Sequence, residues 1–117
     1  MRKIKFEAWD LDAEQMYSWD SIKQLFHEHL DHPRIRVRQY TGVNDKHGKE
    51  YYEGDILRND RGAILEVISE GAGFYVRGYD PLSKRQVYEL LDVFASWSEI
   101  IGDRYRNPEL VRSIGWP

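Results

Sequence analysis

The histidine-rich segment HEHLDH, residues 27–32, is the first candidate for chemistry, because imidazole and carboxylate groups are common metal ligands. On a helix, Glu28 and His32 lie four residues apart and share a face, as do His27 and Asp31. This order differs from the HExxH pattern, in which both histidines of a zinc site share one helical face with the glutamate between them. We therefore interpret the segment as the solvated end of a helix and predict no metal or other cofactor.

Two groups of acidic residues could bind calcium or act as paired acid–base groups. Residues 10–14, DLDAE, begin like a calcium-binding loop but lack its central glycine and the bidentate glutamate at its twelfth position. The second group lies between residues 39 and 60 and consists of Asp45, Glu50, Glu53 and Asp55. These carboxylates lie beside glycines and turn residues, where Asp and Glu commonly accept hydrogen bonds from backbone amides. Since no nucleophile, base and orienting group can be assembled, we predict that the protein is not an enzyme.

A row of arginines ending in a tyrosine forms a candidate binding face, which we call the arginine face: Arg34, Arg36, Arg38 and Tyr40. In a β-strand these four side chains would point to one side, while the intervening Ile35 and Val37 enter the core. Cations beside an aromatic ring can bind phosphates and stack with bases. Two interpretations stay open, namely a nucleic-acid-binding face and a solvated strand face whose arginines pair with carboxylates.

The N-terminal residues 3–9, KIKFEAW, alternate between charged and apolar side chains, as in a half-exposed β-strand. The acidic DLDAEQ that follows has the chemistry of a turn, and residues 16–18 can return as a second strand, so we predict a hairpin. Trp9 falls on the polar face of the first strand, where it either covers an end of a barrel or contacts a partner. Self-association through this hairpin is one hypothesis that follows.

Residues 20–31 change to a helical period. Their apolar side chains are spaced as one stripe, at positions i, i+3, i+4 and i+8: Ile22, Leu25, Phe26 and Leu30. Asp20 or Ser21 can cap the first turn, and Pro33 ends the helix because the residue before a proline leaves helical geometry. The pattern predicts one helix inserted between strands.

From residue 35 onward, short apolar and aromatic stretches alternate with turns rich in glycine, aspartate and asparagine. We expect a loop of four or five residues near 45–48 and a turn at 59–62, with Gly48 and Gly62 in the left-handed conformation. The predicted strands after the first of these turns are 55–58, 63–69, 74–79, 86–91 and 97–102. Asn107 followed by Pro108 predicts a short C-terminal helix. About seven short strands, with turns every 8–12 residues or so, indicate a small barrel or sandwich.

The composition excludes several classes of protein. The chain has 117 residues, which predicts a single domain spanning 1–117, and it contains no cysteine, which excludes disulfides, thiolate zinc sites and cysteine nucleophiles. Seventeen basic and 20 acidic residues give a net charge of −3, and no segment has a strong excess of one charge. The sequence therefore lacks the concentrated positive charge that is typical of duplex-DNA-binding proteins. The sequence has no apolar run of signal-peptide or membrane-spanning length, so we expect a cytoplasmic protein without membrane association.

Three segments resemble the YopX family: IKFEAWD (4–10), QYTGVNDKHGKEYYEGDIL (39–57) and EIIGDRYRNPEL (99–110). The family consists of small proteins encoded largely by bacteriophages and prophages, so the resemblance implies an intracellular role in a bacterial host. It also implies an SH3-like β-barrel core, here with the N-terminal hairpin, the inserted helix and the short C-terminal helix. It carries over no catalytic residue.

These observations lead to two functional hypotheses. The first is a non-enzymatic phage accessory module that binds a protein, either a second copy of itself or a host or phage protein. The alternative is a small nucleic-acid-binding barrel that uses the arginine face. The two hypotheses differ in salt dependence, because nucleic-acid binding weakens steeply as salt displaces the cation–phosphate contacts.

Overall fold

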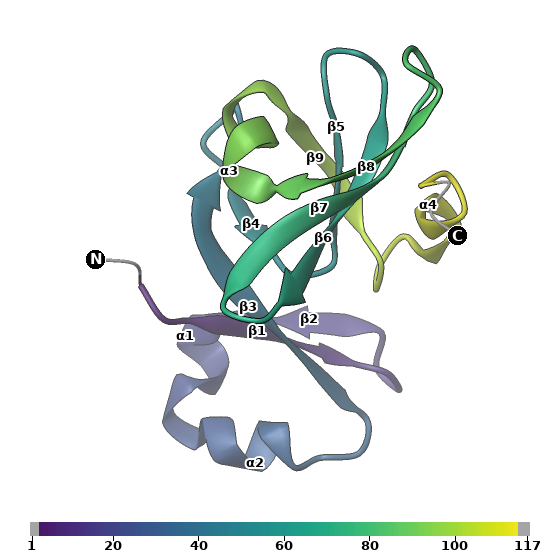
Figure 1. Ribbon diagram of the computed structural model, residues 1–117. Helices are drawn as coiled ribbons and strands as arrows, with labels where there is room; N and C mark the ends of the chain where they lie inside the picture. Colours follow the sequence, from purple (N-terminus) through teal and green to yellow (C-terminus); the bar gives the residue numbers. More distant parts are fainter. Residues whose placement is uncertain (1–2, 115–117) are drawn as a thin grey trace.

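The computed structural model describes residues 3–114, which form a four-stranded and a five-stranded antiparallel sheet (Figure 1). The small sheet has the order β2-β1-β3-β4 and the large sheet the order β8-β7-β6-β5-β9. In Figure 1 the large, curled sheet lies above the small sheet, and the helical insertion lies below it. The prediction of a mainly β protein is confirmed, while the narrower classification as an SH3-like barrel stays a prediction.

The small sheet is built from four strands: β1 (Phe6–Asp10), β2 (Gln15–Tyr17), β3 (Ile35–Asn44) and β4 (Glu50–Tyr52). The predicted hairpin is confirmed, since β1 and β2 pair with Ala8 opposite Tyr17. Its turn follows from Asp10, whose Oδ1 accepts hydrogen bonds from the backbone amides of Asp12 and Ala13, each at 3.0 Å. The Tyr17 hydroxyl donates to Oδ2 of Asp10 at 2.8 Å, so the two strands are also joined through side chains.

The predicted single helix is interrupted. It consists of three short segments: α1 (Trp19–Ile22), a 3-10 turn η1 (Lys23–Leu25) and α2 (Phe26–Leu30). Ile22 and Phe26 pack with Ala8 and Ile35 of the small sheet, but Leu25 and Leu30 are each 54% exposed. The reason is the 3-10 turn, which has fewer residues per turn than an α-helix and rotates the later leucines out of the stripe. Ser18, rather than Asp20 or Ser21, occupies the N-cap position.

The large sheet is built from five strands: β5 (Asp55–Arg58), β6 (Ile64–Glu70), β7 (Gly73–Asp80), β8 (Arg85–Leu90) and β9 (Glu99–Asp103). Its concave side holds the main hydrophobic core, formed around Tyr51, Leu57, Leu65 and Val76. Four of the predicted strands agree with the observed bounds to within about one residue at each end. Gly48 and Gly62 adopt the expected left-handed conformation, with φ angles of 81° and 82°.

One prediction for this region is wrong at its start. The strand predicted from Trp97 begins only at Glu99, because the preceding residues form α3 (Leu91–Phe94) and a 3-10 turn η2 (Ala95–Trp97). Leu91 and Ala95 lie four residues apart, one helical turn, and both are buried in the core. The C-terminal helix is confirmed as α4 (Pro108–Val111), with Pro108 in its first turn and Asn107 at the N-cap position.

Within residues 3–114, no helix combines the length and the apolar character needed to cross a membrane.

Candidate functional site

The structure divides the arginine face into an exposed and a buried part. Arg34 and Arg36 are exposed; Arg34 lies 3.6 Å from the Asp10 carboxylate, and Arg36 donates to the Pro33 carbonyl at 2.8 Å. Arg38 and Tyr40 are only 4% and 8% exposed. The exposure that the strand pattern predicts is therefore wrong at these two positions. The reason is that Asp55 and Asp103 of the large sheet lie against Arg38. Tyr40 instead packs beside Tyr52 of the neighbouring β4, with ring centroids 5.5 Å apart, and Lys5 lies over its ring.

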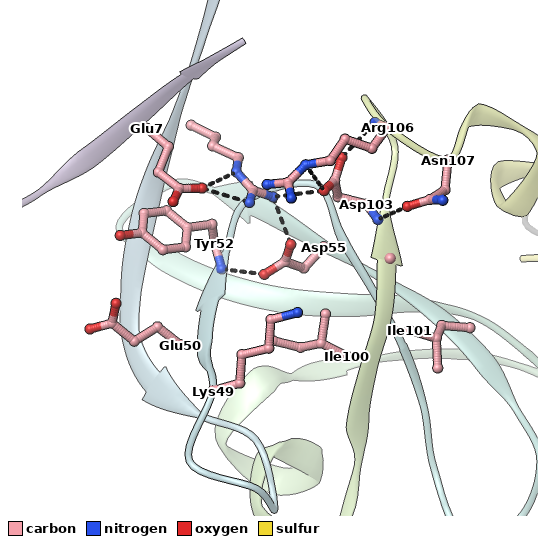
Figure 2. A pocket seen from close by; sticks show the side chains of 12 residues that line it. Glu7, Lys49, Glu50, Tyr52, Asp55, Ile100, Ile101, Asp103, Arg106 and Asn107 are labelled. Carbon is pink, nitrogen blue, oxygen red and sulfur yellow. Dashed lines mark hydrogen bonds and ion pairs between the residues drawn. The ribbon is translucent and has the colours of Figure 1, made fainter. Parts of the chain in front are cut away.

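Arg38 lies at the centre of a buried group of charges, the Arg38 cluster, formed with Glu7, Asp55 and Asp103. The guanidinium group donates to Glu7 Oε1 from Nε at 3.1 Å and from Nη2 at 2.7 Å, and to Asp55 Oδ1 from Nη1 at 2.6 Å. Asp103 Oδ2 is 4.0 Å from the same Nη1. Figure 2 shows the three carboxylates pointing toward one another from different strands. The cluster thus joins β1 and β3 of the small sheet to β5 and β9 of the large one.

Local turn chemistry places the two aspartates. Asp55 begins β5 directly after Gly54, whose φ angle is 84°, and its Oδ2 accepts the Tyr52 backbone amide at 2.7 Å. Asp103 lies opposite Asp55 across β5 and β9, and its Oδ1 accepts the backbone amides of Tyr105 and Arg106 at 2.9 and 2.7 Å. Among the four carboxylates noted between residues 39 and 60, the expected hydrogen bonds from nearby backbone amides are confirmed for Asp55 and for Asp45, which accepts the amides of His47 and Lys49. Glu53 accepts the amide of Gln39 on β3, and Glu50 instead pairs with Lys5 at 2.6 Å.

Burial and ion pairing have opposite effects on the pKa values of the Arg38 cluster. Burial raises the pKa of Asp55 to about 6, although the nearby Arg38 guanidinium and the Tyr52 amide both favour the carboxylate. For Arg38, burial disfavours the charged form, but the Asp55 and Glu7 carboxylates outweigh it and hold the pKa above its usual value. The arginine therefore stays charged and depends on its carboxylate partners for that charge.

The Arg38 cluster forms one wall of a cavity of about 470 Å³ (Figure 2), whose other walls include Lys49, Glu50 and Ile100. Three buried side-chain atoms between residues 3 and 114 have no hydrogen-bond partner: Glu66 Oε2, Arg77 Nε and Ser98 Oγ. None of them lines this cavity. Because the buried charges of the cavity wall are paired within the protein, we interpret the Arg38 cluster as a structural connection between the sheets.

The second candidate surface is the edge strand β8. It lies at one end of the large sheet, and its six residues, Arg85 to Leu90, pair continuously with β7. The opposite edge strand, β9, is covered by other groups: the Ile100 amide donates to Asp45 Oδ2 at 3.0 Å, and the Ser98 carbonyl before it accepts the Lys46 amide at 3.0 Å. β8 contains no proline and no bulge, two of the devices that commonly protect a sheet edge, but it carries two charged residues, Arg85 and Glu89.

Exposed apolar side chains surround β8. We call β8 and these neighbours the β8 surface; the large exposed side chains are Tyr79, Tyr88, Leu90 and Val93. The Tyr88 ring stacks on Tyr75 with centroids 5.2 Å apart, and its hydroxyl bonds to Glu70. Apolar side chains held in place beside an open strand edge are typical of protein interfaces. The residues of β8 predict a strand but not this surface, because strand order cannot be read from the alternation of residues.

The remaining candidates have structural roles. His32 Nδ1 accepts the Arg34 backbone amide at 3.3 Å, and the part of the chain that the structure describes has no group of three or more His, Asp or Glu residues placed to hold a metal ion. Trp9 is 8% exposed, and its ring centroid lies 6.2 Å from that of Tyr105. Of the two interpretations of Trp9, the structure supports the one in which it covers the protein's own interior.

Within residues 3–114, the fold and these surfaces define a small, mainly β protein with two sheets, an internal charge cluster and an exposed edge strand, β8. The family model described as YopX protein matches residues 5–112, so the chain belongs to the YopX family, as the sequence resemblance indicated. Among solved structures, the crystal structure of protein EF1440 from Enterococcus faecalis is similar, with a TM-score of 0.68 and 22% sequence identity. The match covers 95% of this chain and 99% of that chain, and it shows the fold alone. No curated protein matches the chain.

Proposed function

We propose that the protein is a non-enzymatic accessory module that binds a protein partner, and that the partner adds an extended segment to β8. The observation that carries this proposal is the continuous, uncovered edge of β8 beside the exposed apolar side chains of the β8 surface. An edge strand presents backbone donors and acceptors that an added strand can satisfy, and the neighbouring side chains supply affinity and specificity.

The setting of this binding follows from the family. The YopX resemblance implies a phage or prophage protein that acts in the cytoplasm of a bacterial host, without membrane association. The partner is then a second copy of the chain or another phage or host protein. In this setting the Arg38 cluster keeps the two sheets together, so that β8 is presented on a rigid sheet.

Site-specific photo-crosslinking tests the proposal. A photo-reactive phenylalanine replaces Gln86, an exposed residue of β8, and in a control chain it replaces Lys23, an exposed residue of the helical insertion. In bacteria that produce these chains, we expect position 86 to yield a discrete protein–protein crosslink, and position 23 to yield none of the same size. The Leu90 amide donates to the Glu89 side chain at 3.3 Å, and its φ angle of −59° is compatible with proline. Adding Leu90→Pro therefore removes a backbone donor from the outer edge of β8 and should strongly reduce the crosslink.

The outcomes separate the two functional hypotheses. Protein crosslinks of equal yield at both positions, or crosslinks that persist undiminished with Leu90→Pro, would overturn binding through β8. A product that nuclease removes would instead favour the nucleic-acid alternative. That alternative is weakened because only Arg34 and Arg36 of the arginine face are exposed, and both already contact groups of the protein itself.

A further inference from the structure

We infer that the segment added to β8 is β8 of a second copy, paired antiparallel about a two-fold axis at Val87, so that two large sheets join into one. This inference rests on the proposed function and names its partner. A two-fold arrangement uses the same patch on both chains, so the patch must complement itself. The sequence of β8, RQVYEL, can be tested for this property residue by residue.

The geometry of a continuous sheet restricts the possible registers. Directly opposite residues in an antiparallel pair point to the same face. In a two-fold pair of β8 strands, one residue must therefore lie opposite its own copy. If Gln86 or Tyr88 occupied this position, Val87 would lie opposite the charged Arg85 or Glu89. If Val87 occupies it, the two valines meet each other.

Charge complementarity selects the register centred on Val87. In this register Arg85 of each copy lies opposite Glu89 of the other, which gives two opposite-charge pairs related by the axis. Such cross-strand pairs stabilise antiparallel sheets, whereas like charges in the same position destabilise them. Both side chains are exposed, and Glu89 Oε1 accepts the amide of the next residue, Leu90, in a long local bond of 3.3 Å that a partner arginine can replace. The charges that would repel an arbitrary strand thus attract this one.

The exposed side chains beside β8 fit the same register. On the other face of the sheet, Tyr88 of each copy lies opposite Gln86 of the other, which can contact both the ring and its hydroxyl. Beyond the strand ends, the β7–β8 turn of one copy lies beside the beginning of α3 of the other copy. The turn carries the exposed Leu82, and α3 carries the exposed Val93. Apolar side chains that are exposed in the single chain would then be covered in the pair.

Charge reversal tests the inference by sedimentation velocity over a range of concentrations. The wild-type chain should form a reversible dimer with a dissociation constant on the order of micromolar, because the interface consists of one pair of strands and their flanking side chains. Arg85→Glu and Glu89→Arg each turn both cross-strand pairs from attraction to repulsion, so each should raise the dissociation constant by about tenfold or more. The double variant R85E/E89R exchanges the charges and should restore dimerisation to within about threefold of wild type. The control Lys23→Glu, a charge reversal on the helical insertion, should leave it unchanged.

Mixing the two single variants gives the sharpest result. Each R85E strand carries two glutamates and each E89R strand two arginines, so a mixed pair regains both attractions. The net charge changes from −3 to −5 for R85E and to −1 for E89R, because each reversal changes it by two. Both chains are therefore net negative, and their overall charges oppose association. A mixed dimer under conditions where each variant alone is monomeric would support pairing in this register.

Several results would overturn the inference. They are a wild-type chain that stays monomeric at several hundred micromolar, single variants that dimerise like wild type, and a mixture that forms no mixed dimer. Crosslinking from position 86 to a different protein, with a monomeric wild-type chain, would overturn the inference and leave the proposed function standing. Since Arg85 lies opposite Asp80 on β7, the R85E chain is checked for cooperative thermal unfolding. If it does not fold, the E89R chain alone should lose the homodimer and form a mixed dimer of intermediate affinity with wild type.

Discussion

Replacing Arg38 with methionine should destabilise the protein more than any other single change to a charged side chain of β3. Methionine has a similar length and fills the space with apolar atoms, so the change isolates the loss of charge and hydrogen bonds. It leaves Glu7 and Asp55 without the guanidinium group that lies within 2.7 and 2.6 Å of their carboxylates. It also removes the cation from the Tyr52 ring, whose centroid lies 5.0 Å from the guanidinium carbon.

The size of the effect follows from the burial of the pair. The side chains of Arg38 and Asp55 are 5% and 4% exposed, so solvent cannot replace the lost partner. Removing one partner of a buried ion pair costs about 3–5 kcal/mol, because the other charge stays buried and unpaired. Against a total stability on the order of 5–15 kcal/mol, this is a large fraction. With a urea m-value of about 1–3 kcal/mol/M, the unfolding midpoint should fall by roughly 1–5 M.

Urea unfolding followed by circular dichroism measures this loss, with Arg36→Met as the matched control. Arg36 lies two residues away on the same strand but is exposed, so its replacement should cost about 0.5 kcal/mol or less. The double variant R38M/D55N should lose less unfolding free energy than the sum of the two single losses, by about 0.5–3 kcal/mol, because it leaves no unpaired carboxylate at position 55. Equal losses for Arg38→Met and Arg36→Met, or strict additivity with Asp55→Asn, would refute the structural role of the Arg38 cluster.

Three further predictions concern pH and packing. Because the pKa of Asp55 is about 6 in the folded protein and about 3.9 in the unfolded chain, the folded state binds more protons between these values. The unfolding free energy should therefore fall as pH rises from about 4 to 6, and Asp55→Asn should remove this slope in thermal melts. Burial alone would raise the pKa of Asp45, but the amides of Ile100, Lys49 and His47 donate to its carboxylate and lower it. The Asp45 carboxylate therefore stabilises the fold above pH 4 or so, and this stabilisation is lost on acidification. Asp45→Ala should lower the unfolding free energy at pH 7 by about 1–3 kcal/mol. It should also make the decrease in unfolding free energy at acidic pH smaller. A Cβ at Gly78 would lie 2.5 Å from the Ile64 carbonyl oxygen, so Gly78→Ala should cost about 1–3 kcal/mol in urea unfolding. Gly62→Ala, which has open space but a φ angle of 82°, should cost only about 1 kcal/mol, and the reverse order of the two would contradict the packing argument.

Local patterns in the sequence were sufficient for the features that depend on neighbouring residues. The hairpin turn at Asp10, the left-handed Gly48 and Gly62, and the helix start at Asn107-Pro108 each follow from chemistry within a few positions. The interruption of the predicted helix by a 3-10 turn did not follow, because the same apolar spacing fits a continuous helix. Tertiary contact with the small sheet, rather than helix propensity, determines which of its apolar residues are buried.

The features that define the candidate sites depend on residues far apart in the sequence. Arg38 and Arg36 lie on the same strand and belong to the same alternating pattern. Arg38 is a buried charge only because Asp55 and Asp103 of the other sheet lie against it. Likewise, β8 has the composition of an ordinary strand. It becomes a candidate interface because the strand order leaves it at an edge while other groups cover β9. Strand order is a property of the whole topology and is not encoded in the six residues of β8.

Residue-resolved amide hydrogen exchange of β8 at two protein concentrations tests the central claim most directly. The amides of β8 that point away from β7 have no partner strand in the single chain and should exchange fast in dilute solution. We predict that their exchange slows when the wild-type concentration rises above the dissociation constant, and that it does not slow in the E89R variant. The amides of β7, which are paired in both states, serve as the internal reference. Exchange of the outward β8 amides that stays equally fast at every concentration, with or without a partner protein present, would contradict the account.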